Sequence, residues 1–318
     1  MIDKYGRTID YARFSITDRC NLRCVYCMPA SGVVGYHNVL SDNEWIRIAH
    51  ILADLGIQKI KITGGEPLAR ASVPELIASL KSIPGIAHVS LTTNGTLLSG
   101  VAEKLSASGL DGINISLDTM DDARYQVITR TDRFSDAIQG IESAIAAGIP
   151  SIKLNAVPLM GIDKADIIGL AAYAKHHPIH VRFIELMPIG SGKMLRGEPP
   201  LNIRTILTQA YGTMTSYTKT LGNGPAVYEN IAGFQGKIGF ISALSDCFCQ
   251  TCNRIRITAD GVLKTCLHMD QGISLIEETS DTLTRRIRRA IWHKPVGHAF
   301  LPGEESPGLA RIMAQIGG

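Results

Sequence analysis

The feature that most constrains the fold of this chain is a regular alternation of short β-branched runs with longer amphipathic segments, extending from Tyr11 to Leu186. Such alternation is typical of repeated β/α units that build a parallel sheet. Strands are expected at residues 11–17, 57–63, 88–93, 113–117, 152–157 and 180–185. Helices are expected at about residues 42–55, 73–82, 98–108, 135–147 and 164–176, several of them closed by Gly56, Gly109 or Gly148 as C-cap residues.

The ends of the expected strands carry polar and glycine-rich segments. Parallel strands of this kind form either an open doubly wound sheet or a closed or partial barrel, and in both the chemistry gathers at the carboxyl ends of the strands. Such segments recur on successive strands, which predicts one shared site. They are Asp18-Arg19-Cys20, Gly64-Gly65-Glu66-Pro67, Thr92-Thr93-Asn94-Gly95 and Ser116-Leu117-Asp118.

Three cysteines with the spacing C-x3-C-x2-C follow the first expected strand, namely Cys20, Cys24 and Cys27. Thiolates suit zinc, copper(I) and iron-sulfur clusters. Three cysteines leave one iron of a four-iron cluster open, whereas a structural zinc normally takes four protein ligands. A partial zinc site and buried structural thiols are the alternatives. The tight spacing after a strand favours a cluster with an open iron.

A glycine pair, Gly64-Gly65, follows the second expected strand. Two glycines at a strand end let a ligand approach the backbone closely and expose N–H groups. The pair alone is a weak signal, because many β/α turns contain one. Its position beside the cysteine triplet of the first strand predicts that both segments serve the same site.

A second cysteine group lies near the C-terminus, and its spacing of C-x2-C-x13-C is made by Cys249, Cys252 and Cys266. Seven cysteines are an odd number for a disulfide framework, which favours metal ligation. One alternative is a four-cysteine zinc site that includes Cys247. Arg254 and Arg256 lie on one face of an expected strand beside these thiols. A structural zinc does not need such arginines, whereas an anionic ligand does.

Charge and hydropathy exclude several classes of protein. The net charge of +3 is too weak for a sequence-independent nucleic-acid binder or a membrane-surface protein. No apolar run reaches the roughly 18 residues of a membrane span. Residues 1–7 lack the apolar core of a signal peptide, so we expect a cytoplasmic protein.

The composition and the pattern of expected elements change near residue 190. Beyond it stand a Pro-Pro pair, an expected helix near residues 203–211 and Gly-rich pieces with strand character at residues 228–231, 237–241 and 255–258. The length of 318 residues allows one large domain or two ordinary ones. We therefore expect two parts, residues 1–190 and 191–318.

The first cysteine triplet, with Tyr26 just before its last cysteine and Gly64-Gly65-Glu66-Pro67 after the next strand, resembles the radical S-adenosylmethionine superfamily. The resemblance implies a partial (β/α)6 TIM-like barrel and a [4Fe-4S] cluster whose open iron binds the methionine part of S-adenosylmethionine. It also implies that the glycine pair faces the methionine amino group.

Further stretches resemble one family within it, the GTP 3',8-cyclases of molybdenum cofactor biosynthesis, over nearly the whole chain. They are Gly6-Arg7, Arg13, residues 15–20, 26–29, 62–68, 91–95 and 114–118, Lys153, residues 182–188, the segment from Cys249 to Cys266 and the terminal Gly317-Gly318. At Lys61 that family more often has Arg, so a bidentate phosphate contact would become a point charge. Cys247 matches no family role and is interpreted as a spare thiol.

The resemblance implies a role for each matching residue. Cys20, Cys24 and Cys27 hold the first cluster, and Tyr26, Gly65, Ser116 and Met187 line the cofactor site. Cys249, Cys252 and Cys266 hold a second [4Fe-4S] cluster whose open iron meets guanine. GTP is bound by residues expected mostly at strand ends, with closer catalytic roles for Arg13, Arg254 and Arg256; the full set is Arg13, Lys61, Thr92, Lys153, Arg182, Arg254 and Arg256.

The implied reaction is radical cyclisation of GTP to 3',8-cyclo-7,8-dihydro-GTP by a lyase that uses S-adenosylmethionine and two clusters. The implied partners are GTP, an electron donor and the next enzyme of pterin synthesis, and the chain acts as a monomer or homodimer. Two hypotheses compete with this one. The first is another radical S-adenosylmethionine enzyme, for example one that modifies a peptide, and the second is a non-enzymatic zinc or redox-sensing protein.

Three remaining features have ordinary interpretations. The basic run 285–289 is the solvated face of an amphipathic helix, with a contact to an acidic partner as the alternative. His293 and His298 are expected to have surface or capping roles rather than to bind metal. Gly317 and Gly318 would ordinarily form a frayed end. The family resemblance implies instead that this tail reaches the active site.

Overall fold

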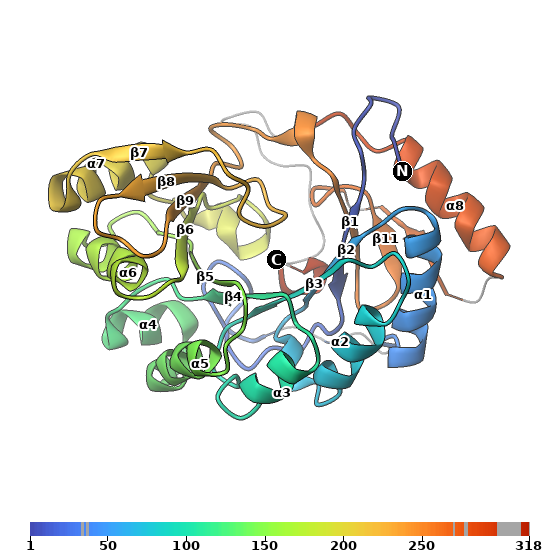
Figure 1. The fold of residues 1–318 in the computed structure, drawn as a ribbon, viewed down its shortest axis with the longest axis horizontal. Coiled ribbons are helices and arrows are strands. Elements are labelled where there is room, and N and C mark those ends of the chain that lie inside the picture. Colours follow the sequence, from blue (N-terminus) through green and yellow to red (C-terminus); the bar gives the residue numbers. More distant parts are fainter. Residues whose placement is uncertain (33–34, 36–37, 270, 277–278, 298–312, 318) are drawn as a thin grey trace.

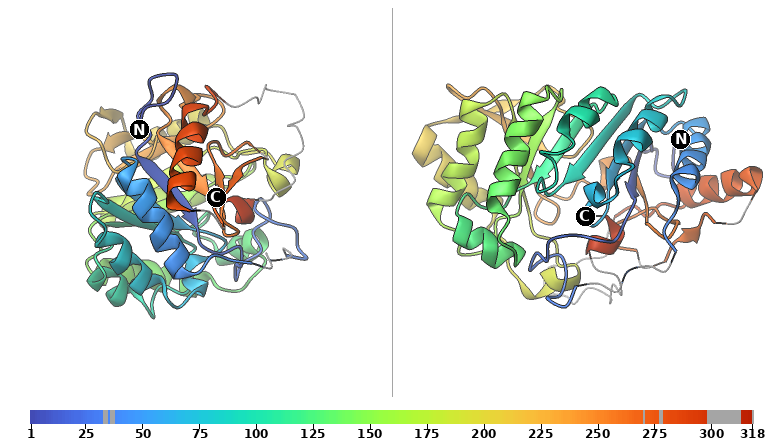
Figure 2. Two further views of the ribbon diagram at one scale, coloured as in Figure 1. Left: turned by 90° about the vertical axis from the view of Figure 1, so that its right-hand side faces the viewer. Right: turned by 90° about the horizontal axis from the view of Figure 1, so that it is seen from below.

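One continuous sheet runs through the protein. The computed structural model describes residues 1–32, 35, 38–269, 271–276, 279–297 and 313–317. Within them the sheet has twelve strands in the order β12-β11-β10-β1-β2-β3-β4-β5-β6-β9-β8-β7. Figure 1 shows the strands lining the inside of a curved body whose longer helices lie outside, and Figure 2 gives the same arrangement from two further sides.

Six parallel β/α units form the centre of this sheet, and each of their strands pairs with the next along the chain. The strands are β1 (Tyr11–Ser15), β2 (Lys59–Thr63), β3 (His88–Thr93), β4 (Gly112–Ser116), β5 (Ile152–Ala156) and β6 (His180–Ile184). The helices are α1 (Asp42–Asp54), α2 (Val73–Lys81), α3 (Ala102–Ala107), α4 (Asp122–Thr129), α5 (Phe134–Ala146) and α6 (Lys164–His176). The predicted partial (β/α)6 barrel is confirmed.

Local sequence accounts for the bounds of these helices. The Ser41 hydroxyl accepts from the Glu44 backbone N–H and the Glu44 carboxylate accepts from Ser41, a capping box that begins α1. Past its end, Gly56 has a φ of +88°, a conformation that costs a glycine little. The apolar face of α1 packs on the sheet, where Trp45 stacks on Phe14 with ring centroids 4.7 Å apart.

The chain beyond residue 190 adds strands to both edges of the six-stranded unit. At one edge β9 (Ile238–Ile241) runs parallel to β6, followed outward by the antiparallel β8 (Val227–Ile231) and β7 (Met214–Tyr217). At the other, β10 (Arg254–Ile257) runs parallel to β1, followed by β11 (Val262–Lys264) and β12 (Ile273–Ser274). The same hydrophobic core contains residues from both sides of residue 190. The boundary there stays a prediction.

The remaining helices lie in the C-terminal part. They are α7 (Pro200–Tyr211), α8 (Ser280–Trp292) and the short α9 (Met313–Ile316). The 3₁₀ turns are η1 (Pro67–Ala69) after β2, η2 (Gly190–Met194) after β6 and η3 (Cys249–Thr251) before β10. In α8 the side chains of Leu283, Ile287 and Ile291 are buried. Arg285 and Arg289 are exposed, as expected of a solvated face. His293 is exposed at the C-cap, while His298 lies outside the described residues.

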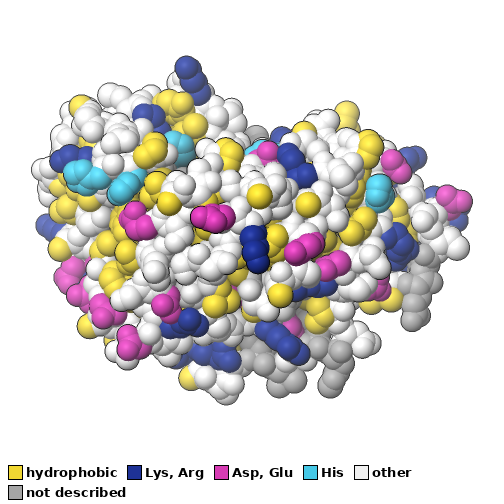
Figure 3. Space-filling view, turned by 60° about the horizontal axis from the view of Figure 1, so that its bottom comes forward, with side chains coloured by type: hydrophobic (Ala, Val, Ile, Leu, Met, Phe, Trp, Pro, Cys, Tyr) yellow, Lys and Arg dark blue, Asp and Glu magenta, His cyan; other side chains and the backbone are white. Residues whose placement is uncertain are grey.

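Two expectations differ from the structure. No helix was expected at α4, whose weak apolar periodicity buries only Tyr125, Ile128 and Thr129. The helix expected from residue 98 begins at Ala102. Within the described ranges no helix is long and apolar enough to cross a bilayer. On the face shown in Figure 3, basic and acidic side chains are interspersed, in keeping with the small net charge.

Candidate functional site

A cavity of about 380 Å³ lies inside the curve of the sheet, between β1–β6 and the C-terminal part. Every residue that the sequence singled out as a metal, cofactor or nucleotide ligand lines it. These residues are Cys20, Cys24, Cys27, Cys249, Cys252, Cys266, Tyr26, Gly65, Ser116, Met187, Arg13, Lys61, Thr92, Lys153, Arg182, Arg254 and Arg256. The structure therefore brings together side chains that are more than two hundred residues apart in the sequence.

The first cysteine triplet lies in the loop after β1. The Cys27 and Met28 backbone N–H groups both donate to the Cys24 carbonyl, at 2.9 and 3.1 Å, which makes a tight turn. The Leu22 backbone N–H approaches the Cys20 sulfur at 3.4 Å, and the Asn94 amide approaches it at 3.9 Å from the end of β3. Donors of this kind stabilise a thiolate ligand.

Helix α4, which the sequence did not predict, is hydrogen-bonded to this loop at its C-terminal end. The Arg23 and Val25 backbone N–H groups donate to the carbonyls of Thr129 and Ile128, both at 2.9 Å. Arg130, which follows α4 with a φ of +58°, donates from its side chain to the carbonyls of Arg23 and Met28. A signal was available, because the Asp121 carboxylate caps the helix by accepting from the Arg124 N–H.

Burial makes deprotonation of the three thiols of the first triplet unfavourable when no metal is bound. Burial, with a further contribution from Cys20, raises the pKa of Cys27 to about 12. Burial and then Cys27 raise the pKa of Cys24 well above its ordinary value. Deprotonated sulfurs packed this closely need a cationic centre between them. The residues therefore fit a metal cluster better than they fit free cysteines.

The glycine pair after β2 packs against the chain just ahead of Cys20. A Cβ at Gly65 would stand 2.3 Å from the Arg19 carbonyl oxygen, and one at Gly64 would stand 2.5 Å from that of Thr17. The Gly65 N–H donates to Thr17 and the Glu66 N–H to Arg19, both at 2.7 Å. The glycines are thus required by contact between two loops, a reason that the sequence alone did not show.

Two buried carboxyl groups hold the loops of this end of the barrel. Glu66 accepts from the Thr93 hydroxyl and the Asn94 N–H at 2.7 Å, and burial raises its pKa to about 7 against those hydrogen bonds. Asp118 accepts from the Tyr26 hydroxyl at 2.7 Å and from the Val157 N–H at 2.8 Å. Tyr26 is therefore fixed beside the triplet.

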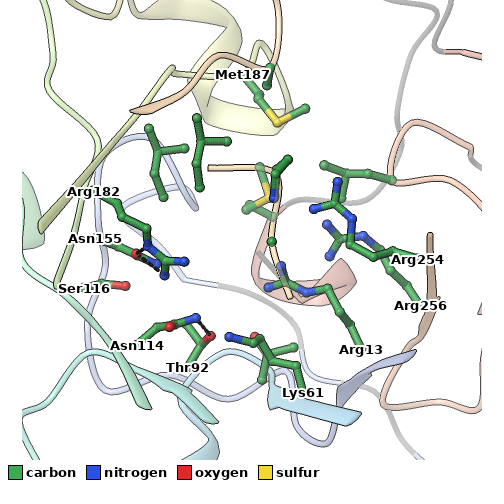
Figure 4. A pocket seen from close by; sticks show the side chains of 18 of the residues that line it. Arg13, Lys61, Thr92, Asn114, Ser116, Asn155, Arg182, Met187, Arg254 and Arg256 are labelled. Carbon is green, nitrogen blue, oxygen red and sulfur yellow. Dashed lines mark hydrogen bonds between the residues drawn. The ribbon is translucent and has the colours of Figure 1, made fainter. Parts of the chain in front are cut away.

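Cations from neighbouring strands stand side by side in the cavity. In the register of the sheet Arg256 of β10 faces Arg13 of β1, and Arg13 faces Lys61 of β2. Figure 4 shows these side chains and Arg254 directed toward the space between the two arms of the sheet, with Arg182 reaching in from the opposite side. Like charges in adjacent register positions repel one another, so this row is suited to a bound anion.

The cavity as a whole is electropositive. Its lining includes seven Lys and Arg side chains but two carboxylates, Asp118 and Glu185. Burial followed by the neighbouring cations lowers the pKa of Lys61 and of Arg256 well below their ordinary values. Both carboxylates already accept hydrogen bonds from backbone N–H groups. A ligand with several negative charges would relieve this repulsion.

The placement of these cations differs from the expectation in one respect. Arg13, Lys61 and Lys153 lie within β1, β2 and β5 rather than at the carboxyl ends of those strands. Thr92 and Ser116 do stand at strand ends, and Asn114 donates to the Thr92 hydroxyl at 3.3 Å. The anion-binding part of the cavity therefore extends down the inside of the barrel, below the mouth that carries the first cysteine triplet.

Sequence reasoning missed two sets of residues that line this deeper part. Asn155 accepts from the Arg182 guanidinium at 2.8 Å and orients it. The loop between β7 and β8 places Leu221, Gly222, Asn223, Gly224 and Pro225 on the cavity wall. A Cβ at Gly222 would lie 3.3 Å from the Lys153 Nζ. Two glycines around a polar residue gave a turn signal but no indication of where the turn points.

The second triplet lies on the opposite wall. Cys249 begins the turn η3 and Cys252 caps its end, where the Cys252 N–H donates to the Cys249 carbonyl at 3.2 Å, and Cys266 follows β11. Burial tends to raise the pKa of Cys252, but Arg254 and Lys294 outweigh it and lower that pKa to about 7. Cys247 is exposed at the rim of the cavity, and its role stays a prediction.

The thiol donors of the two triplets suit iron-sulfur clusters. In the described part of the chain no group of three or more His, Cys, Asp and Glu side chains is placed to hold a single metal ion. The three cysteines of a four-iron cluster each ligate a different iron, so their sulfurs need not meet at one point. The fit rests on the soft donor set and on the shared cavity.

The C-terminal segment enters the cavity between the two triplets. Met313 and Ala314 of α9 line it, and the Ala314 backbone hydrogen-bonds the Cys27 thiol. The Gly317 carbonyl accepts from the Arg256 guanidinium at 2.5 Å. A Cβ at Gly317 would lie 3.0 Å from side-chain atoms of Ser15 and Thr63. Gly318 lies outside the described residues.

Family models match two parts of the chain. The model described as Radical SAM superfamily matches residues 14–174, and the one described as Molybdenum Cofactor Synthesis C matches residues 179–300. Two curated relatives named GTP 3',8-cyclase, from Clostridium perfringens (strain SM101) and Heliobacterium modesticaldum, are 42% and 44% identical to this chain. In both, the alignment covers 100% of this chain and 100% of the relative.

Solved structures show the same fold at low sequence identity. Streptococcus suis SuiB bound to S-adenosylmethionine is 15% identical with a TM-score of 0.65, covering 91% of this chain and 67% of its own. The [FeFe]-hydrogenase maturase HydG from Carboxydothermus hydrogenoformans is 19% identical with a TM-score of 0.52, covering 65% of this chain and 52% of its own. At these identities the similarities show the fold alone.

Proposed function

The chain belongs to the radical S-adenosylmethionine superfamily and, within it, to the GTP 3',8-cyclase family, and from this premise we propose which of its residues perform the reaction. The reaction is the radical cyclisation of GTP to 3',8-cyclo-7,8-dihydro-GTP, an early step of molybdenum cofactor biosynthesis. The cofactors are S-adenosylmethionine and [4Fe-4S] clusters. The observation that carries the assignment of residues is one cavity with a cysteine triplet on each of two walls and a row of cations between them.

The first wall binds the radical source. Cys20, Cys24 and Cys27 would hold the cluster that, with S-adenosylmethionine, supplies a 5'-deoxyadenosyl radical able to take hydrogen from C3' of GTP. Tyr26 is fixed by Asp118, and its backbone and ring line the cofactor site. Gly65 presents backbone beside the loop of the triplet, while Ser116 and Met187 lie further along the same cavity.

The second wall and the barrel interior bind the nucleotide. Lys61, Lys153 and Arg182 surround the deeper part, where several cations suit a triphosphate. Arg13, Arg254 and Arg256 lie nearer the second triplet, and Cys249, Cys252 and Cys266 would hold a cluster that meets guanine. Thr92 of β3 adds a hydroxyl between the strands that carry Lys61 and Lys153. The roles of these side chains are binding and orientation, because the cofactors carry the difficult chemistry.

The two parts of the chain have different roles. Residues 1–190 form the cofactor-binding part, and residues 191–318 supply the second cluster site. The protein works in the cytoplasm as a monomer or homodimer, receives electrons from a separate donor and passes its product to the next enzyme of pterin synthesis. The family supports the need for a substrate nucleotide and an electron donor.

Metal content and product analysis test the proposal. Protein reconstituted without oxygen should contain about eight irons per chain for two four-iron clusters, against one or two zinc ions for a zinc protein. With S-adenosylmethionine, a reductant and GTP, it should form the cyclised nucleotide, detected by mass spectrometry. A protein that cleaves the cofactor but neither binds GTP in a titration nor alters it would favour the peptide-modifying alternative instead.

GTP affinity should fall as the pH rises through about 8. Burial, and after it Arg182, lower the pKa of Lys153 to about 8, so the free protein loses this charge above that pH. A bound phosphate favours the charged amine, so binding and protonation support each other. From the protonated fraction alone, affinity should be about tenfold weaker at pH 9 than at pH 7.

Calorimetric titration at the two pH values measures this effect. Lys153→Arg provides the control, because a guanidinium stays charged across the range. The pH dependence due to this residue should disappear in that variant, leaving the contribution of Lys61. An equal pH dependence in both proteins would show that Lys153 does not contact the phosphates.

Removal of Gly317 and Gly318 should slow cyclisation while both clusters stay bound. The Gly317 carbonyl accepts a hydrogen bond from Arg256, so the deletion frees a guanidinium that the tail otherwise orients. Loss of one such charge-assisted contact costs about 1.5–3 kcal/mol. Product formation and iron content of the deleted protein measure the two effects, and unchanged product formation would remove the tail from the active site.

A further inference from the structure

Lys294 is a buried cation beside the second cysteine triplet. The sequence offered no indication of a role for this lysine. Its side chain is 2% exposed and lines the cavity. The ammonium donates to the Arg254 carbonyl at 3.0 Å and to the Thr265 carbonyl, and the Cys252 sulfur is its third acceptor. A lysine ammonium has three donors and no acceptor. Three acceptors around one nitrogen match the charged form and leave no donor unused.

These acceptors connect Lys294 to two of the three cysteines of the triplet. Cys252 is a direct partner, and the carbonyl of Thr265 belongs to the residue next to Cys266. The carbonyl of Arg254 lies at the start of β10, two residues after Cys252. One ammonium therefore fixes the distance between the turn that carries Cys252 and the end of β11.

The residues that follow Lys294 pack against the third cysteine. A Cβ at Gly297 would lie 3.7 Å from the Cys249 Cβ and 4.0 Å from its sulfur. These are ordinary van der Waals distances, so residue 297 packs directly against this cysteine. We call residues 294–297 the brace segment.

Arg7 of the N-terminal segment holds the brace segment in place. Its guanidinium donates to the carbonyls of Lys294, Pro295 and Val296 at 3.3, 2.7 and 3.2 Å, and also to the Cys249 carbonyl at 2.9 Å. The Asp3 carboxylate, which is buried, accepts from the Arg7 Nε at 2.6 Å. A buried arginine with its donors used on four carbonyls is a rigid connection.

We propose that Lys294, held in place by Arg7, positions the ligands of the second cluster. The fixed positive charge of Lys294 raises the reduction potential of that cluster. A reduced cluster carries one more negative charge than an oxidised one, so a nearby cation stabilises the reduced state. Hydrogen bonds to the ligand sulfurs act in the same direction. The proposal rests on the proposed function only in that the second triplet holds a cluster.

The experiment measures the potential of the second cluster without using activity. In a full-length parent with Cys20, Cys24 and Cys27 replaced by Ala, only the second cluster remains, and its signal can be titrated by electron paramagnetic resonance. Lys294→Met keeps the length of the side chain and removes its charge, so it should titrate at a more negative potential than the parent. Lys294→Arg should stay close to the parent. Each protein should retain about four irons.

A matched control separates local charge from net charge. Arg285→Gln removes the same charge from the exposed face of α8 and should leave the potential unchanged. Equal potentials in the parent and Lys294→Met would overturn the proposal while the proposed function stands. A parent without a cluster would overturn both.

Loss of the cluster from a variant is informative as well. If Lys294→Met binds no iron, Lys294→Gln supplies a neutral side chain that can still donate to a carbonyl. Iron retained in Lys294→Arg but lost from both neutral variants would support the need for the charge. Loss from all three would overturn it, because shape and not charge would then decide cluster binding.

Discussion

Replacement of Cys20, Cys24 and Cys27 together by Ala is expected to abolish cleavage of S-adenosylmethionine and all product formation. These cysteines are the thiol ligands on the first wall of the cavity, and the loop holds them beside Tyr26 and Gly65. The iron content should fall from about eight to about four per chain, because the second triplet is untouched. Anaerobic assays of 5'-deoxyadenosine and iron measure the two effects.

GTP binding provides the internal control for this variant. The cations of the proposed nucleotide site lie within strands and not in the cysteine loop, so a calorimetric titration should still detect GTP. Cys247→Ala is the matched cysteine control, since this exposed thiol is interpreted as spare. It should keep eight irons and full activity. Loss of four irons from Cys247→Ala would show that Cys247, rather than Cys249, belongs to the second set of ligands.

Replacement of Arg254 by Ala is expected to abolish cyclisation while cofactor cleavage persists at least in part. Arg254 stands beside Cys252, and its guanidinium lies over the Phe248 ring at 4.7 Å from the centroid. Because this side chain is already ordered, little conformational entropy is lost when it orients a nucleotide. Loss of one oriented donor typically costs about 10²–10³ in rate. Product and 5'-deoxyadenosine are measured in the same reaction.

Two further variants define the role of Arg254. Arg254→Lys keeps the charge but loses the planar fork, so it should recover only part of the activity. Arg288→Ala removes an arginine from the exposed face of α8 and should leave the ratio of product to 5'-deoxyadenosine unchanged. Wild-type product formation by Arg254→Ala would remove this residue from the nucleotide site.

The six central β/α units could be predicted from sequence because their signals are local. β3 and α6 begin and end at the expected residues, and the glycines after α1, α3 and α5 have the positive φ expected of C-cap residues. The first cysteine triplet was visible because its spacing is short. Its place in the cavity followed from the rule that strands of a parallel sheet present one shared edge, whereas Arg13, Lys61 and Lys153 lie deeper, within their strands.

What the sequence could not show depends on contacts between distant segments. α4 has little apolar periodicity, and carbonyls of its last turn accept hydrogen bonds from the cysteine loop. The cations of β1, β2 and β10 form one row through sheet register, which no single strand reveals. Lys294 is unremarkable in sequence, and its importance appears only when Arg7 and the second triplet surround it.

The pairing of β1 with β10 has a consequence for how the molecule forms. Tyr11 lies opposite Arg254, so this ladder closes a loop that contains most of the chain. Loop closure of this length must lose its entropy before the ladder forms, and such non-local pairings are slow relative to the contacts between successive β/α units. During synthesis the first cysteine triplet emerges long before the strand that completes its cavity. The loop of the first triplet therefore stays open until the strands of the last third of the protein have added to both edges of the sheet.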